Sequence, residues 1–581
     1  MKKKILWLGL SWLIVAAFVL ASCAPAVPGE QEEEEEEEVG LPQRGGTLTV
    51  LVKKMRADVR SWDEILGEWI EVVFVCKPYS QHLMAADVSM GKTGTGEVRF
   101  GGRYLAPEVL TGELAESWEL LQDPLRVVFS IRPGVYWAAD NVDFMENREL
   151  TADDVVFSIN RRLSDTARLD PSWLGEWVKS VTATGRYTVV VELSNTYPDW
   201  HYVLGWGCQA TVQNPEMIEA GIEDWRNAVG TGPFMLTDYV SGSLIEYTRN
   251  PNYWDTTIID GKEYSIPLVD KLVYPLIVDT AAQLAALRTG KVDIWEDVPW
   301  IYKDTLASTN PELVSWESES WDNYMIILRQ NIGPPLDILE VRRAMMMAID
   351  NQAIIDDLYG GSGVMQNFPI PATQPESVYT PLEKLPLSTR ELYEYHPEKA
   401  RQLLADANYP DGFDIEILVD TKAPSVDIMS MVKDYWADVN IDLELIPVDE
   451  GTQWGLALDR DYKHGLSYCW ANAPTLAGGM CYSLKESMWN VGDIDDPIFE
   501  DLVARYNLAP TMDEANALLK QAAVRTLEQV HLILLPGANS LLYAWPWVKN
   551  YEGETMSSRW TSIGFQSIAW IDQGLKTDMG H

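Results

Sequence analysis

Residues 114–158 decide the fold, and they contain three segments: LAESWE (114–119), VVFSIRPGVYW (127–137) and LTADDVVFS (150–158). Residues 126–131 are rich in β-branched and aromatic side chains, which predicts a strand. Pro133 and Gly134 predict the turn that ends this strand. Three aromatic side chains are large enough to anchor the core of a small sheet: Trp118, Phe129 and Trp137.

A helix is predicted directly after this sheet. Thr151 supplies its N-cap and Asp154 the acidic third residue, which together are typical of a capping box. Apolar residues then follow at helical spacing on one face: Val155, Val156, Ile159 and Leu163.

Farther out, strands and helices alternate. Further strands are predicted at residues 47–52, 187–193, 292–294, 413–420 and 441–448. Further helices are predicted from Thr280 to Gly290, over residues 337–359, over residues 426–439, and after the capping box of Thr511 and Glu514. The alternation through the final third predicts an α/β fold with mixed layers.

Composition excludes several classes of protein. The 581 residues include 45 Lys plus Arg and 87 Asp plus Glu, a formal charge of −42. So acidic a chain is unsuited to binding nucleic acid or anionic lipid, which both need surplus basic residues. With 46% apolar residues it is nevertheless globular, and its length predicts two to four domains. Trp (24) and Tyr (25) outnumber Phe (11), which favours partly hydrated aromatic surfaces.

The N-terminal segment predicts export and a lipid anchor. Three Lys precede an apolar run that ends in LASC (20–23), as in a signal peptide over residues 1–22. The LASC ending resembles the bacterial lipobox, and that resemblance implies lipidation of Cys23 as the mature N-terminus. Residues 23–43 include seven consecutive Glu, whose mutual repulsion predicts an extended acidic tether.

The residues that usually carry chemistry form no recognisable motif. Six His are scattered without metal-ligand spacing, so we expect no metal and no cofactor. Paired carboxylates of a secreted hydrolase are invisible in sequence, which leaves that class as a remote alternative. Four Cys remain after Cys23, with three possible pairings: Cys76, Cys208, Cys469 and Cys481. We expect the short loop between Cys469 and Cys481 to be closed by a disulfide.

More segments follow the first three in order: GTGPF (230–234), RNPNYW (249–254), VRRA (341–344) and AID (348–350). Together these segments resemble the family 5 solute-binding proteins of ABC importers, the peptide and nickel group. The resemblance implies a periplasmic-binding-protein-like class II fold, in which two lobes joined by a hinge carry an extra third domain. It also implies a transport protein rather than an enzyme, which closes around its solute by population shift.

The resemblance further implies a discontinuous domain organisation. Lobe I would take residues 44–73, 229–313 and 535–581, the extra domain residues 74–228, and lobe II residues 314–534. Gly230, Gly232 and Pro233 combine conformational freedom with a fixed turn, which suits a hinge that crosses between lobes.

Cargo is the least determined property. In peptide-binding members a Trp is followed three residues later by an Asp that pairs with the peptide ammonium. Here the residue three positions after Trp470 is Ala473. A buried ammonium without a countercharge is costly. Oligopeptide is the leading cargo, and oligosaccharide of the β-glucan or mannan type is the alternative, because sugar rings stack on Trp and Tyr. Candidate ligand contacts are Trp470, Asn472, Trp321, Asn323 and Tyr324.

The resemblance implies ABC permease and ATPase subunits as partners. We expect an extracytoplasmic monomer at the periplasm or cell surface, attached to the membrane through its lipid anchor only, and no nucleic acid partner.

Overall fold

The structure is a computed structural model that describes residues 41–52, 59, 61–66, 70–100, 105–164, 177–207, 209–319, 322–365, 376–422, 424–471, 478–557 and 562–581. Gln43–His581 form one compact unit. The predicted signal peptide and Cys23 lie outside the described residues. Within these described ranges, no helix has both the length and the apolar character needed to cross a membrane.

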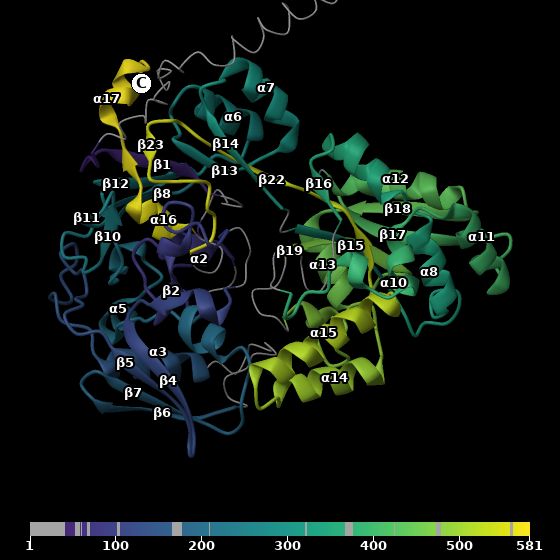
Figure 1. The fold of residues 1–581 in the computed structure, drawn as a ribbon, viewed down its shortest axis with the longest axis horizontal. Coiled ribbons are helices and arrows are strands. Elements are labelled where there is room, and N and C mark those ends of the chain that lie inside the picture. Colours follow the sequence, from purple (N-terminus) through teal and green to yellow (C-terminus); the bar gives the residue numbers. More distant parts are fainter. Residues whose placement is uncertain are drawn as a thin grey trace, which may run out of the picture. The chain divides into compact units, whose positions relative to one another are not determined.

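The first strand of the chain lies inside a seven-stranded sheet (Figure 1). Neighbours in this sheet run in the order β14 (Val314–Ser318), β22 (Ser540–Ala544), β13 (Ile294–Val298), β1 (Thr47–Leu51), β12 (Lys271–Pro275), β9 (Leu244–Arg249) and β8 (Phe234–Val240). β1 pairs parallel with both β12 and β13, and the other pairs are antiparallel. The predicted strand over residues 47–52 is confirmed, whereas the strand predicted at residues 292–294 begins only at Ile294.

Asp293 explains why β13 begins late. Its buried carboxylate accepts hydrogen bonds from the backbone N of Thr49 (2.8 Å), Nε1 of Trp547 (2.8 Å) and Nζ of Lys576 (2.8 Å). One side chain therefore joins the first strand of the sheet to the C-terminal helix, α17 (Gln573–Asp578).

A five-stranded sheet forms the second large layer. Its order is β18 (Ile441–Val448), β17 (Phe413–Asp420), β19 (Gly465–Ala471), β15 (Asp322–Leu328) and β20 (Ile533–Leu535). The two strands predicted over residues 413–420 and 441–448 are confirmed, and they pair in parallel through the crossover helix α12 (Ser425–Ala437). This sheet has its own buried apolar cluster, distinct from the one around the other sheets.

The opening segments form a four-stranded antiparallel sheet, in the order β4 (Ala115–Gln122), β5 (Leu125–Ile131), β7 (Thr188–Leu193) and β6 (Val178–Gly185). Phe129 and Trp137 are fully buried in its core as expected, but Trp118 is only partly buried. The helix predicted after the sheet is α3 (Ala152–Leu163), and Oδ2 of Asp154 accepts the Thr151 N–H at 2.9 Å. The small sheet and its capped helix are therefore confirmed.

Short strand pairs and helices complete the described fold. The strand pairs are β2 (Met84–Ala86) with β3 (Leu110–Gly112), β10 (Thr256–Ile259) with β11 (Lys262–Ser265), β16 (Gly363–Val364) with β21 (Gly537–Ala538), and β23 (Val548–Lys549) with β24 (Trp570–Ile571). The helices not yet named are α2 (Ile70–Cys76), α5 (Pro215–Ala220), α6 (Thr280–Arg288), α7 (Lys303–Thr309), α8 (Leu339–Met347), α9 (Asn351–Ala353), α10 (Leu387–Arg390), α11 (Pro397–Asp406), α13 (Glu450–Leu458), α14 (Pro497–Asn507), α15 (Met512–Glu528) and α16 (Ile563–Ile568).

The single helix predicted over residues 337–359 is wrong. α8 ends at Met347, and α9 starts a new helix whose N-cap, Asp350, accepts the Ala353 N–H at 2.9 Å. The apolar spacing continues across this break, but the Asp350 side chain satisfies the first N–H groups of a second helix and so favours a restart. A π-helical turn, Ile354–Leu358, then leads to the loop at Gly360.

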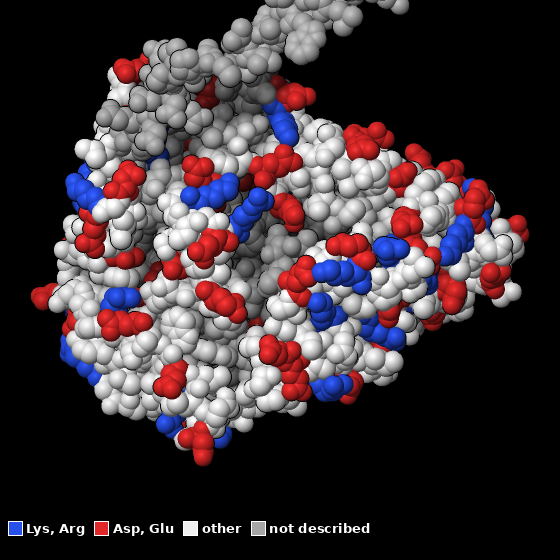
Figure 2. Space-filling model, in the orientation of Figure 1, with Lys and Arg blue, Asp and Glu red and all other residues white. Residues whose placement is uncertain are grey.

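Charges of both signs are interspersed on the face drawn in Figure 2. Many basic side chains there and elsewhere pair with carboxylates, for example Lys384 with Glu376 at 2.6 Å and Lys485 with Asp495 at 2.7 Å. Since acids outnumber bases almost two to one in the sequence, such pairing leaves a surplus of acids. The excess that excludes polyanion partners is thus spread over the folded surface.

Candidate functional site

Three of the predicted ligand residues lie at one end of the five-stranded sheet. β15 and β19 pair antiparallel, with Asn323 opposite Trp470 and Tyr324 opposite Cys469. On its other edge β15 pairs with β20, which places Tyr324 opposite Leu535. The other two predicted residues, Trp321 and Asn472, lie outside the described residues.

Both connections between the two large sheets adjoin this end of β15. β15 follows β14, the edge strand of the seven-stranded sheet, and β20 leads through β21 into β22 of that same sheet. The yellow ribbon of β22 and the teal ribbon of β15 show these connections in Figure 1. Asn323 and Tyr324 therefore lie near the start of β15 (Asp322–Leu328), directly after one crossing.

A stack of aromatic rings extends from the same strand. The ring of Tyr468 is parallel to that of Trp454 (centroids 4.8 Å apart, 3° between planes), and Trp454 stacks on Trp489 (5.2 Å, 27°). All three side chains are half-buried. Position 468 shares a strand face with position 470, because strand residues alternate between faces. This stack was not predicted, since its members are 14 and 21 residues from Tyr468 in the chain, and only the overall Trp and Tyr excess hinted at it.

The disulfide expected between Cys469 and Cys481 is absent, because both are thiols in the structure. The ring of Tyr468 contacts that of Tyr482 (centroids 6.3 Å apart), so the Tyr468 face of β19 meets the segment that carries Cys481. Cys469, as the next residue in the strand, points to the opposite face of the sheet.

The predicted hinge residues lie in a different connection from the one expected. Gly230, Gly232 and Pro233 lead into β8 from the chain that follows α5, so they do not join the two large sheets. The backbone there is held against residues 78–79: the Gly232 N–H donates to the Tyr79 carbonyl at 2.8 Å. A Cβ on Gly230 would lie 1.7 Å from that same carbonyl oxygen, which explains the glycine by close packing rather than by bending.

The structure instead gathers polar groups at the true crossings. Glu317 of β14 binds Nζ of Lys303 (2.8 Å), Oγ of Ser362 (2.5 Å) and Nδ2 of Asn539 (2.9 Å). Partial burial opposes ionisation of Glu317, but hydrogen bonds from these three groups outweigh it and lower its pKa to about 2. The carboxylate thus connects both crossing segments and the loop after Gly361, and sequence gave no signal for it.

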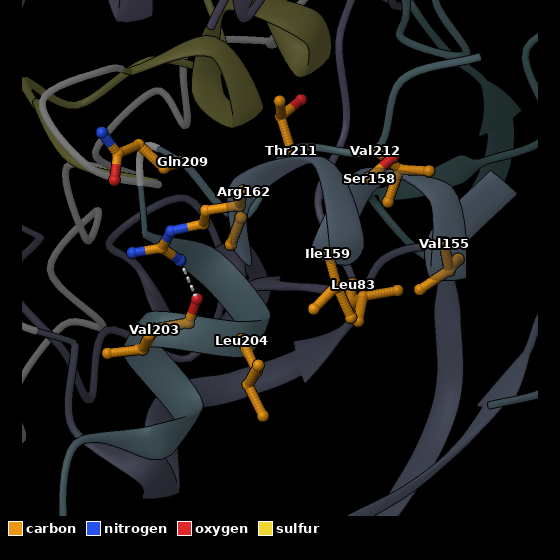
Figure 3. A pocket seen from close by; sticks show the side chains of 11 residues that line it. Leu83, Val155, Ser158, Ile159, Arg162, Val203, Leu204, Gln209, Thr211 and Val212 are labelled. Carbon is orange, nitrogen blue, oxygen red and sulfur yellow. Dashed lines mark hydrogen bonds between the residues drawn. The ribbon is translucent and has the colours of Figure 1, made fainter. Parts of the chain in front are cut away.

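Two hollows lie elsewhere in the described part of the chain. One, lined by α3 and residues 203–212, contains about 10 Å³, roughly the space of a single water (Figure 3). In it Nη1 of Arg162 donates to the Val203 carbonyl at 2.5 Å. The other is an open depression of about 350 Å³, whose wall carries the bidentate ion pair of Arg161 with Asp63 (2.5 and 2.7 Å). Neither hollow is lined by the predicted ligand residues.

A metal site needs several ligand side chains close together. Within the described part of the chain, no group of three or more His, Cys, Asp or Glu side chains is arranged to hold a metal ion. In the ladder of β15 and β19, Asn323 pairs with Trp470 and Tyr324 with Cys469, and none of these four residue types is a carboxylate.

Comparison with known proteins places this chain among bacterial transport proteins. Residues 109–490 match the family model "Bacterial extracellular solute-binding proteins, family 5 Middle". Heme-binding protein A of Haemophilus influenzae is 30% identical over 324 residues, covering 53% of this chain and 55% of that protein. The dipeptide-binding protein of Escherichia coli is 27% identical over 391 residues, covering 61% of this chain and 66% of that protein. The chain thus spans between half and two thirds of the length of these two relatives.

A solved structure shows the same fold. The periplasmic binding protein DppA of Helicobacter pylori, in complex with peptide STSA, superposes with a TM-score of 0.69 at 19% identity, covering 91% of this chain and 99% of that one. The mixed α/β multi-domain fold of these binding proteins is therefore confirmed for this chain. The chain belongs to the bacterial extracellular solute-binding proteins of family 5, a family of transport binding proteins rather than enzymes.

Proposed function

We propose that this chain captures an oligopeptide outside the cytoplasm and delivers it to an ABC permease driven by ATPase subunits. The observation that carries the proposal is the ladder of β15 and β19, which sets Asn323 against Trp470 beside both crossings in a chain of this family. The Escherichia coli relative is named a dipeptide-binding protein, and the Helicobacter pylori structure holds a peptide. Both support peptide as the cargo.

The proposed site lies between two lobes. Lobe I takes residues 44–73, 229–313 and 535–581, lobe II residues 314–534, and the extra domain residues 74–228. Cargo contacts are proposed for five residues of lobe II: Trp470, Asn472, Trp321, Asn323 and Tyr324. The solute contacts both lobes only when they are closed, so binding stabilises the closed form that the permease recognises.

The hinge of this motion is proposed at the two crossings rather than at Gly230, Gly232 and Pro233. Glu317 accepts hydrogen bonds from both sides of the crossings, which supports this placement. Hinges are short element-terminal segments that absorb backbone rotation, and residues 319–321 and 536–539 have that position in the chain.

Oligosaccharide of the β-glucan or mannan type is the second candidate cargo. The stack of Tyr468, Trp454 and Trp489 favours it, because apolar faces of sugar rings pack on aromatic rings. Ala473 favours it too, since it offers no countercharge to a peptide ammonium.

Membrane attachment is proposed through a lipid on Cys23 alone, with residues 23–43 as a tether and the protein acting as a monomer. The LASC ending of the signal sequence supports this. Metabolic labelling with a palmitate analogue should mark the wild-type chain and leave Cys23→Ala unmarked. Equal labelling of both would contradict the assignment.

A thermal-shift screen separates the cargo candidates. Residues 43–581 would be heated with dipeptides and tetrapeptides, with cello- and manno-oligosaccharides, and with haemin as a third class. A ligand present at 100 times its Kd adds roughly 2.7 kcal/mol to the folded state, which gives a measurable rise in Tm. Stabilisation by peptides only is the expected result. Stabilisation by oligosaccharides or haemin only would refute peptide as the cargo.

A further inference from the structure

A helix attached to the five-stranded sheet contacts the four-stranded sheet through hydrogen bonds. Tyr506, near the end of α14, donates from its hydroxyl to Oδ2 of Asp199 at 3.0 Å. Thr196 donates from Oγ1 to the carbonyl of Ala509 at 3.2 Å. Residues 196–199 follow directly after β7, so the two sides of this contact lie about 300 residues apart in the chain. We name these four residues the strap contact.

The strap contact is desolvated. Asp199 is 0% exposed and Tyr506 1% exposed. Apolar side chains from both sides belong to the same large buried cluster as Tyr506: Phe499, Leu502 and Val503 from α14, and Trp177 and Tyr197 from the other side. Trp177 and Tyr197 stack with centroids 5.1 Å apart. A hydrogen bond between a hydroxyl and a carboxyl group is stronger in such surroundings than its equivalent in water.

The opposite end of α14 is fixed to the five-stranded sheet. Asp496 caps the helix and accepts from Nε of Arg525 (2.7 Å) and from Nε2 of His531 (3.2 Å), two residues before β20. Arg342 of α8 donates to the carbonyls of Gln529 (2.9 Å) and Val530 (3.2 Å) at the end of α15. The hairpin of α14 and α15 is therefore carried by the five-stranded sheet, and Figure 1 shows it extending from there toward the four-stranded sheet.

The crossings join the five-stranded sheet to the seven-stranded sheet, whereas the strap contact joins α14 to the segment after β7 of the four-stranded sheet. The crossings at residues 319–321 and 536–539 are covalent and persist in any arrangement, whereas the strap contact exists only when α14 reaches residues 196–199. We infer that the strap contact is a latch: it stabilises the closed arrangement of the lobes from outside the cargo site, and Tyr506 and Asp199 act as positioning residues that never touch cargo.

This inference rests on the proposed function for its consequence in transport. Solute closes the lobes only to the extent that it binds the closed form more tightly than the open form. A latch that already favours the closed form reduces the difference in affinity that solute must supply. Loss of one buried hydrogen bond changes such an equilibrium by up to roughly tenfold. Removing the latch should therefore weaken cargo binding without altering a single cargo contact.

Small-angle X-ray scattering of the ligand-free secreted chain, from residue 23 onward with Cys23→Ala, tests the latch directly. The variants are Tyr506→Phe, Asp199→Asn and Thr196→Val. The matched control is Tyr247→Phe, which removes another fully buried hydroxyl, donated to the Val75 carbonyl at 2.8 Å within one part of the fold. The tether is the same in all samples, so differences in radius of gyration report the folded body.

We expect a larger radius of gyration for Tyr506→Phe and Asp199→Asn, no further increase when they are combined, and none for Tyr247→Phe. The cargo found in the screen should bind roughly tenfold more weakly to Tyr506→Phe. The latch would be overturned if folded Tyr506→Phe and Thr196→Val had the wild-type radius of gyration and lost as much Tm as the control. The contact would then be a fixed domain interface. Because the scattering experiment uses no cargo, it tests the latch even if the peptide screen finds no ligand.

Discussion

The two large sheets use their polar side chains in opposite ways. In the seven-stranded sheet, the buried carboxylate of Asp293 is saturated by Thr49, Trp547 and Lys576, all from the protein itself. In the five-stranded sheet, Asn323 and Trp470 meet at the end of the ladder next to the crossings. Asp293 thus holds the fold, whereas Asn323 and Trp470 are proposed to bind cargo, and substitutions should separate stability from binding accordingly.

Asp293→Ala should have the largest effect. It leaves the Lys576 ammonium and two N–H donors without their acceptor in a buried site, which costs about 3–5 kcal/mol of unfolding free energy. Urea unfolding at pH 7 measures this, with Asp578→Ala on the exposed C-terminal helix as a control expected within about 0.5 kcal/mol of wild type. An Asp293→Ala variant that is as stable as wild type but has lost cargo binding would contradict the assignment of Asp293 to stability.

Trp470→Ala should act on binding instead. An aromatic anchor at the centre of a binding site contributes about 2 kcal/mol or more, so the Kd for cargo should rise about 30-fold. Calorimetric titration measures this. The matched control is Trp225→Ala, which removes the aromatic ring beside Arg226 and should leave the Kd unchanged. Equal losses of affinity in both variants would contradict the placement of the site.

The pH dependence of stability should reveal a third kind of polar group, the partly buried acid Glu113, whose pKa is raised. Burial raises the pKa of Glu113 to about 7, although Lys77, the His82 N–H and Gln81 favour its charged form. Since the folded state then binds more protons than the unfolded state between about pH 4.5 and 7, stability should fall as pH rises through that window, by on the order of 2 kcal/mol.

Glu113→Gln should remove that loss. Denaturant unfolding at pH 5 and pH 8 measures it, and Glu108→Gln, an exposed acid nearby, should keep the wild-type difference. A pH profile that is the same in Glu113→Gln and wild type would show that Glu113 titrates normally.

Glu317→Gln should have the smallest effect on stability. Its side chain is 36% exposed and its partner Lys303 49%, so solvent screens the pair and the expected cost is below about 1 kcal/mol. Because the folded pKa lies below the ordinary one, this contribution is present above about pH 4.5 and is lost as pH falls toward 2. A cost of several kcal/mol at pH 7, in comparative urea unfolding, would place Glu317 with Asp293 instead.

Local patterns predicted the local elements well. The unit of β17, α12 and β18 and the capping box of α3 follow from spacing and from two polar residues, so they could be read directly. The break at Asp350 was missed because apolar spacing continues through it, while a single capping side chain decides the geometry.

Long-range relations explain the remaining differences. β14 pairs with β22 across more than 220 residues, so the crossings and Glu317 could not be located without the fold. The stack around Trp454 depends on strand faces that composition does not reveal, and the spacing of Cys469 and Cys481 did not show that they form no disulfide. The pairing of Asn323 with Trp470 could not be predicted from spacing, although the family resemblance singled out Trp470 and the chemistry of sugar binding suggested Asn323.

Calorimetric titration of residues 43–581 with the peptide that gives the largest thermal shift tests the central claim most directly. We expect saturable binding of one peptide per chain, with a negative heat-capacity change from apolar burial and a large loss of affinity in Trp470→Ala. Absence of saturable peptide binding, or peptide binding that Trp470→Ala leaves intact, would contradict it.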